Sequence, residues 1–254
     1  MDIMKKIISF VTIIFVFATS VRATVDDDFI EANNFYKAGD YEQAIATYNS
    51  ILNQGYVSVP LYYNLGNAYF RADNLAAAIL NYERALKIDP LDKDVRQNLD
   101  YVNSKTIDKF NKVPELFITR WFNAILNWFT VSQWGVITIM LMVLVCVLAV
   151  VFFLTDSYRT RQISFYVGIV MLVLLICAYV NGSILKNRME NLNYAIVMTP
   201  SVMVKSSPDE NSADKFLVHE GCKVEIEDNV SNWCKVKLSD GNTGWIEKMA
   251  VENI

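Results

Sequence analysis

The sequence is poor in the groups that most often carry chemistry in proteins. It has one histidine and four cysteines among 254 residues. It contains no glycine-rich phosphate-binding loop, no cysteine–histidine pair in plausible reach and no paired carboxylates in a recognisable frame. Since nothing in it predicts a catalytic constellation, a metal site or a bound cofactor, we expect that the protein is not an enzyme.

Clustered positive charge is also missing from the polar parts of the chain. Residues 24–112 carry 9 Lys and Arg against 13 Asp and Glu, and residues 187–254 carry 7 against 11. Binding of nucleic-acid phosphates needs clustered Lys and Arg. The two acidic segments therefore argue against a nucleic acid as partner.

Charge is absent altogether from two long apolar stretches, residues 135–154 and 163–180. At about 1.5 Å per residue each covers roughly 27–30 Å, the thickness of the hydrocarbon core of a bilayer. We predict transmembrane helices over 135–154 and 163–184, joined as a hairpin by a cytoplasmic loop at 155–162. Because neither span holds Asp, Glu, Lys, Arg or His, we expect an anchor or a packing surface rather than an ion pathway.

The first residues have the pattern of an export signal, in which Lys5 and Lys6 precede an apolar stretch at 7–18. We predict a signal peptide over residues 1–23 or, because Arg22 is unusual so close to the cleavage site, an uncleaved anchor. Either version carries the following segment across the membrane.

The hairpin would then return the C-terminal segment to the same side as the first segment. Arg159 and Arg161 in the connecting loop agree with this orientation, but Arg120, Lys186 and Arg188 flank the opposite ends, so the distribution of positive charge does not decide it. On the export signal we predict a multi-pass protein of the bacterial inner membrane with both polar segments in the periplasm.

Residues 25–90 repeat with a period of 34 residues, within a helical region that we expect to span 25–110. "ANNFYKAGDYEQAIATYNSIL" (32–52) aligns with "GNAYFRADNLAAAILNYERAL" (66–86) and resembles the tetratricopeptide repeat, which pairs two helices in each copy. Asp28 and Glu31 replace apolar residues of the pattern, so we expect the first helix to be frayed or to begin late. Residues 93–108 read as an amphipathic capping helix whose apolar positions are Val95, Leu99 and Val102.

In such repeats the first helix of each pair lines a concave groove. Projecting the period onto this chain gives the candidate groove residues Phe29, Asn33, Tyr36, Tyr63, Asn67, Phe70, Gln97 and Tyr101. Asparagine amides beside aromatic rings suit an extended peptide, although the asparagines also fit an ordinary helix surface.

Some repeats of this kind bind a C-terminal carboxylate with two asparagines and several basic residues. Asn33 and Asn64 match those asparagines, but Phe29, Asp94 and Asn98 stand at the basic positions. A clamp that recognises a free carboxylate is therefore not expected.

The segment 111–134 is rich in aromatic residues, with three tryptophans at 121, 128 and 134. Phe117, Trp121, Ile125 and Trp128 share one helical face. This pattern favours an amphipathic helix in the membrane interface or against the hairpin, with an ordinary connector as the alternative.

Residues 195–254 alternate polar and apolar positions between turn signals and resemble the bacterial SH3-like domain. The resemblance depends on the residues Val202, Val204, Pro208, Gly221, Val224, Ile226, Trp233, Val236, Gly241 and the motif "GWI" at 244–246. It implies a small all-β barrel of a kind used outside the cytoplasm to bind cell wall or peptide. Trp233 and Trp245 are candidates for its ligand surface or for its core.

Two cysteines lie in this tail. A hairpin of strands 223–228 and 233–238 would place Cys234 opposite Glu227 and leave Cys222 about 16 Å away, beyond the roughly 7 Å limit for a disulfide. We predict no bond between them and, for the same reason, no metal site with His219, which we expect at the surface. A redox sensor built on the two thiols is a further hypothesis.

The order of the parts, with "NLGNAYFR…AILNYERALKIDPLDKDVRQNLDYVNSKTIDK", resembles the Bacteroides aerotolerance protein E (BatE) family. That resemblance implies an inner-membrane protein encoded beside membrane proteins with von Willebrand factor A domains and a MoxR-type ATPase, with a role in tolerance of oxygen or envelope stress. We expect a membrane-anchored scaffold whose repeats bind a protein of that group. The alternative is an anchor that binds peptidoglycan through the SH3-like domain.

Overall fold

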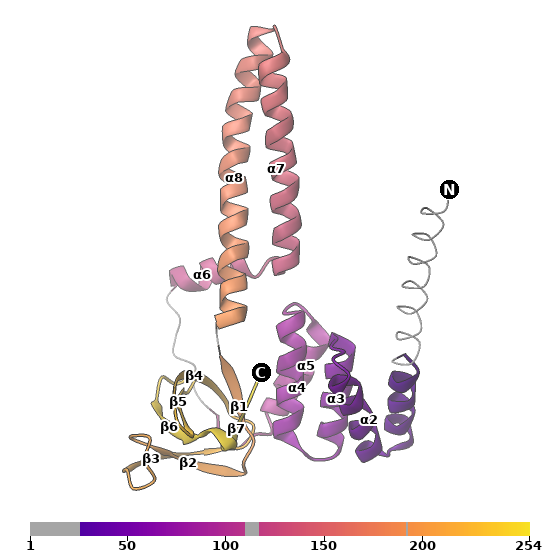
Figure 1. Cartoon of the computed structure of the whole chain (residues 1–254), viewed down its shortest axis with the longest axis vertical. Helices are drawn as coiled ribbons and strands as arrows, with labels where there is room; N and C mark the ends of the chain where they lie inside the picture. The colour runs from indigo at the N-terminus through magenta and orange to yellow at the C-terminus, as the bar shows by residue number, and fades with distance from the viewer. Residues whose placement is uncertain (1–25, 110–116, 192) are drawn as a thin grey trace, which may run out of the picture. The chain divides into compact units, whose positions relative to one another are not determined.

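The structure of the chain, a computed structural model, describes residues 26–109, 117–191 and 193–254 (Figure 1). The predicted signal segment 1–23 and the first residues of the predicted linker 111–134 lie outside the described residues. The chain forms two compact units. One unit combines the helical repeats with the C-terminal sheet, and the other contains the long apolar helices.

The repeat region consists of two helix pairs followed by a single helix. Its helices are residues 26–38, α2 (Tyr41–Asn53), α3 (Val59–Arg71), α4 (Leu75–Ile88) and α5 (Lys93–Asn103). The first of these is helical from the first described residue onward, so the expectation of a frayed or late first helix is wrong.

The 34-residue period extends to the turns within each pair. Gly39 and Asp73, one period apart, both have positive φ, at 84° and 62°. The side chains of Asp40 and Asn74, which follow them, accept hydrogen bonds from backbone N–H groups in the first turns of α2 and α4. Each pair therefore has the same left-handed turn and the same N-cap, which stop the first helix and start the second.

Close packing within the second pair requires a residue without a side chain at Gly66. A Cβ atom there would lie 2.8 Å from Cε1 of Tyr82, which is 1 % exposed. Val95, Leu99 and Val102 of α5 are buried in the same cluster, as predicted. The single helix α5 therefore covers the apolar face that two repeats alone would leave open.

The C-terminal region is a seven-stranded antiparallel sheet with strand order β3-β2-β6-β5-β4-β1-β7. The strands are β1 (Tyr194–Val197), β2 (Ser201–Lys205), β3 (Asp214–His219), β4 (Lys223–Val230), β5 (Trp233–Lys237), β6 (Thr243–Glu247) and β7 (Val251–Asn253). Its core holds both tail cysteines, Cys222 and Cys234, as buried thiols.

One register in this sheet differs from the prediction. A bulge between Ile226 and Asp228 shifts the β4–β5 hairpin, so that Cys234 pairs with Asn229 instead of Glu227. The extra residue on β4 could not be seen from hydrophobic alternation, because a bulge interrupts the alternation on which the register was based.

The sheet packs against the second helix of repeat two, within the same compact unit. Ile196 of β1 belongs to the buried cluster of Ile79 on α4, and Met198 and Ile254 pack against that cluster. A Cβ atom at Gly221 would lie 2.9 Å from Cδ1 of Ile79. The sheet therefore covers a face of α4 that the sequence left without an expected partner.

Polar contacts surround this apolar interface. Glu83 accepts a hydrogen bond of 2.6 Å from the ammonium of Lys223, and Arg84 lies 2.9 Å from the carboxylate of Glu252. Asp108 accepts from the backbone N–H of His219 at 2.6 Å and lies 2.9 Å from its Nδ1. His219 is thus a half-buried interface residue, and its expected place at a free surface is wrong.

The second unit contains α6 (Phe117–Leu126), α7 (Val131–Leu154) and α8 (Tyr158–Asn191). The connector between α7 and α8 is shorter than expected, because α8 begins at Tyr158 and takes Arg159 and Arg161 into its first turn. Within this unit, Figure 1 shows α7 and α8 side by side and α6 lying across them near the start of α7.

Both long helices, α7 and α8, have the length and composition needed to cross a membrane. None of the apolar window of α7 and 11 % of that of α8 is buried inside the structure. The central helix of a water-soluble protein buries such residues, so these two helices expose apolar surface that water does not solvate well.

Candidate functional site

The eight groove residues predicted from the period lie on three helices of the repeat region. Phe29, Asn33 and Tyr36 are on the helix at 26–38, Tyr63, Asn67 and Phe70 are on α3, and Gln97 and Tyr101 are on α5. All are half-buried except Gln97 and Tyr101, which are exposed.

Hydrogen bonds join the same faces of these three helices. The amide oxygen of Asn33 accepts from the hydroxyl of Tyr48 at 2.7 Å and from Nδ2 of Asn64 on α3 at 2.9 Å. One period later, the amide oxygen of Asn67 accepts from Tyr82 at 2.7 Å and from Nδ2 of Asn98 at 3.0 Å. We call these six residues the asparagine–tyrosine network.

The network explains why asparagine and tyrosine occur at these positions in both copies. Each buried tyrosine hydroxyl needs an acceptor, and the amide of the paired asparagine provides one. Asn33 and Asn67 were predicted as groove residues, whereas Asn98, which donates to Asn67 and to the hydroxyl of Tyr63, was not. The period was the signal for it, since Asn98 lies 34 residues after Asn64.

The orientation of the two central amides follows from the network. Because two donors meet each Oδ1, the Nδ2 groups of Asn33 and Asn67 must point the other way. Among the described residues neither Nδ2 has a protein acceptor, and neither is a buried atom without a partner. The two amides therefore present N–H donors to solvent, one period apart.

Aromatic rings flank these donors. Phe29 packs on Tyr48 at a centroid distance of 5.9 Å, and Phe70 meets Tyr101 edge-on at 5.7 Å. Tyr36 packs on Tyr41 at 5.5 Å. The face thus combines two fixed amide donors with apolar rings, a combination that suits the backbone and side chains of an extended peptide.

Burial also changes the acidity of the network. It raises the pKa of Tyr48 to about 12 and raises the pKa of Tyr82 further above its usual range. Both hydroxyls are therefore protonated donors at neutral pH, as the network requires.

The two tryptophans of the SH3-like domain lie on the outer face of its sheet. Alternation places Cys234 and Val236 of β5 and Ile246 of β6 in the core, and it turns Trp233 and Trp245 outward, where both are half-buried. Their interpretation as core residues is therefore wrong.

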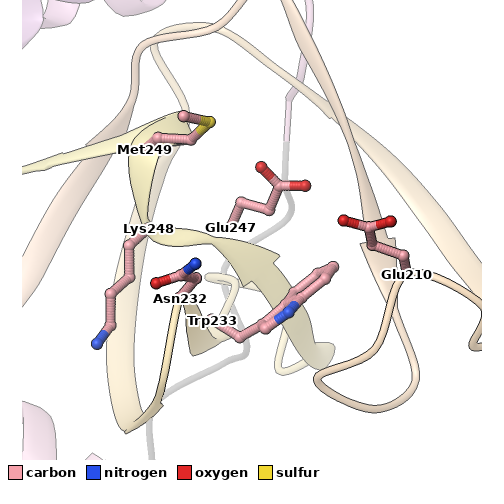
Figure 2. A pocket seen from close by; sticks show the side chains of 6 residues that line it. All are labelled: Glu210, Asn232, Trp233, Glu247, Lys248 and Met249. Carbon is pink, nitrogen blue, oxygen red and sulfur yellow. The ribbon is translucent and has the colours of Figure 1, made fainter.

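Trp233 borders a pocket of about 380 Å³ on this domain, whereas Trp245 does not. The lining residues are Glu210, Asn232, Trp233, Glu247, Lys248 and Met249. Glu247 pairs with Trp233 across β5 and β6. Figure 2 shows the carboxylates of Glu210 and Glu247 near the Trp233 indole, while the Lys248 ammonium points away.

This pocket offers an aromatic surface and two carboxylates, which together suit a ligand with an amine or several hydroxyl groups. Sequence reasoning found Trp233 but missed Glu210, which lies in a loop far from it in the sequence. The sequence pattern could have indicated Glu247, because strand alternation puts it on the same face as Trp245. Within the described parts of the chain, no three His, Cys, Asp or Glu side chains are placed to hold a metal ion.

Comparison with known protein families agrees with the two folded regions. Residues 31–93 match the tetratricopeptide repeat, and residues 200–252 match the bacterial SH3 domain. A search of curated proteins gives no match. The chain thus joins two modules that are typically non-catalytic: a repeat of the kind that binds proteins and an SH3 domain of the kind that binds cell wall.

Proposed function

We propose that the protein is a membrane-anchored scaffold whose repeats bind an extended segment of a partner protein. The observation that carries this proposal is the pair of outward amide donors on Asn33 and Asn67, fixed by the asparagine–tyrosine network. Donors held in one orientation bind peptide carbonyls with little loss of side-chain entropy. The protein needs no catalytic group for this role.

The anchor is the hairpin of α7 and α8. Apolar side chains are exposed over most of these two long helices, and such a surface requires a hydrocarbon solvent. The predicted export signal favours a periplasmic location for the two folded regions, in the inner membrane of a bacterium.

Both folded regions act on one side of the membrane. A hairpin with two spans returns the chain to its starting side, and the contacts of Glu83 with Lys223 and of Asp108 with His219 join the two regions in one compact unit. These two arguments are independent of each other. The resemblance to the aerotolerance family suggests membrane proteins with von Willebrand factor A domains as partners, in a complex that supports tolerance of oxygen or envelope stress.

The test of the groove replaces its donors while keeping its fold. Asn33→Asp with Asn67→Asp keeps an oxygen acceptor for each tyrosine but removes the outward N–H groups. We expect this variant to melt close to the wild type and to lose the partner on co-purification from detergent-solubilised membranes.

The matched control is Lys87→Asp, which makes the same change in net charge at an exposed position of α4 outside the groove and removes only the hydrogen bond from Lys87 to the backbone oxygen of Ile254. It should retain the partner. Partner recovery that is equal for the groove variant and the wild type would contradict the proposal. Asn→Ala changes are a poorer choice, because they leave buried tyrosine hydroxyls without an acceptor and destabilise the repeats.

A second candidate function is cell-wall binding through the pocket beside Trp233, which the match to the bacterial SH3 domain favours. The test is retention of the detergent-solubilised chain on isolated sacculi. Trp233→Ala should abolish retention, and Trp245→Ala, on the same face but outside the pocket, should preserve it. Absence of retention for the wild type would exclude this function.

A further inference from the structure

The helix α6 presents an apolar surface that the described structure leaves open. Phe117, Ile118 and Trp121 are 81 %, 76 % and 63 % exposed, and Trp128, just after the helix, is 68 % exposed. On an α-helix, residues 117, 118, 121, 122 and 125 form one continuous apolar arc, while Thr119, Arg120 and Asn123 form the polar arc. The helix is therefore amphipathic, with its aromatic side outward.

Specific contacts fix α6 to the hairpin within the same unit. The indole N–H of Trp134, at the start of α7, donates to the backbone oxygen of Leu126 at 3.1 Å. Arg188 of α8 donates to the amide oxygen of Asn123 at 2.8 Å. Figure 1 shows that α6 consequently lies across the axis of α7 and α8.

We infer that α6 lies in the plane of the membrane, in the interface between headgroups and acyl chains, with Phe117, Ile118 and Trp121 facing the bilayer. This inference rests on the proposed insertion of α7 and α8. A helix held across a membrane-spanning pair at the end of the span runs parallel to the membrane surface. Tryptophan and phenylalanine at that depth are the side chains that the interface favours.

Charge at this end of the hairpin fits phospholipid headgroups. Arg120 and Lys186 are exposed there, and Arg188 joins α6 to α8. Among the side chains described at residues 117–191, the one acidic group, Asp156, lies in the connector at the other end of α7. Basic residues around an aromatic face suit a membrane surface that contains anionic lipid.

The test uses the tryptophans as depth reporters in the full chain, reconstituted in vesicles of phosphatidylcholine and phosphatidylglycerol. One set of vesicles carries lipids brominated near the headgroups, and another carries lipids brominated near the bilayer centre. We expect the shallow bromines to quench the emission of Trp121 and Trp128. The Trp121→Phe and Trp128→Phe variants should therefore each show less quenchable emission than the wild type. Trp233→Phe, in the SH3-like domain, should lose none.

Other outcomes overturn the inference in distinguishable ways. Leu144→Trp in α7 reports insertion of the hairpin: lack of quenching by deep bromines would refute both the insertion and this inference. If deep bromines quench Leu144→Trp but Trp121→Phe loses none of the emission that shallow bromines quench, the hairpin is inserted and only the position inferred for α6 is refuted. Stronger quenching of Trp121 by deep than by shallow bromines would also refute it, because α6 would then lie in the acyl core.

Discussion

Two helices of this protein, α4 and α7, are both rich in apolar residues, but the apolar side chains are buried in α4 and largely exposed in α7. In α4 every residue from Ala76 to Tyr82 is buried. In α7 most apolar side chains remain exposed, with Met140 at 67 % and Ile139 at 60 %. Composition already separates the two helices in part, because α4 carries Glu83, Arg84 and Lys87 whereas α7 carries no charged residue.

The difference lies in the partners that the rest of the chain supplies. The apolar side chains of α4 belong to one cluster with Val95 and Leu99 of α5 and with Ile196 of the sheet, so the helix is covered by protein. The helix α7 packs against α8 and stays open elsewhere. An apolar helix with protein on one side only needs lipid on the others.

The largest effect that separates the two helices should come from a buried charge. Ile79→Glu puts a carboxylate between α4 and the sheet and should destabilise that unit by about 4 kcal/mol or more. Val143→Glu, on the exposed side of α7, should leave the melting of that unit unchanged and cost membrane insertion about 2.5–3.5 kcal/mol. Thermal melts in detergent and carbonate extraction of membranes measure the two effects. An equal loss of melting temperature in both variants would contradict the difference in burial between α4 and α7.

The asparagine–tyrosine network should make the repeats sensitive to alkali. Burial raises the pKa of Tyr48 to about 12, so the folded chain holds this proton more tightly than the unfolded chain. The stabilisation is complete below about pH 10 and is lost as the pH rises toward about 12, a loss of roughly 2–3 kcal/mol. Urea unfolding at a series of pH values should show this slope, and Tyr48→Phe should reduce it to the part that Tyr82 contributes. An equal slope in both proteins would contradict the burial of that hydroxyl.

One glycine in each region provides a matched pair of substitutions to alanine. Gly66→Ala would press a methyl group into the Tyr82 ring and should cost about 1–3 kcal/mol. Gly168→Ala in α8 has nothing within 4 Å of the added Cβ and should be neutral or slightly stabilising. Denaturant unfolding followed by circular dichroism distinguishes the two. A neutral Gly66→Ala would mean that the helix pair is less tightly packed than described.

The smallest effect should come from the partly exposed ion pair between the repeats and the sheet. Arg84→Gln removes the ion pair with Glu252 and the hydrogen bond to the backbone oxygen of Asn253. It should cost about 1 kcal/mol, with the difference from the wild type shrinking at high salt. Melting temperatures at low and high salt check it. A loss as large as that of Ile79→Glu would show that charge, rather than apolar burial, holds the interface.

Much of the fold followed from the sequence because its signals are local or periodic. The 34-residue period predicted the paired helices of the two repeats, and the uncharged runs predicted α7 and α8. The spacing of Val95, Leu99 and Val102 correctly predicted their burial.

What sequence reasoning missed depends on contacts between distant segments. The sheet covers α4 through Ile196 and Ile254, more than a hundred residues away from Ile79, and nothing in a run of alanine and leucine says which element will cover it. His219 was assigned to the surface because its partner, Asp108, lies on the other region. At the candidate site, the period found Asn33 and Asn67, whereas Glu210 reaches the Trp233 pocket from a loop whose path has no sequence signal.

The most direct test of the account is the sidedness of three single cysteines in a chain that lacks Cys146 and Cys177. The positions are Asn103→Cys at the end of α5, Asn211→Cys in the SH3-like domain and Asp156→Cys in the connector, all exposed. The buried Cys222 and Cys234 should add little background. With a membrane-impermeant maleimide on intact spheroplasts, we predict that the first two positions label equally and that Asp156→Cys labels only after lysis. Labelling of Asp156→Cys in intact spheroplasts, or different labelling of the first two, would contradict a scaffold held by a hairpin with both folded regions outside.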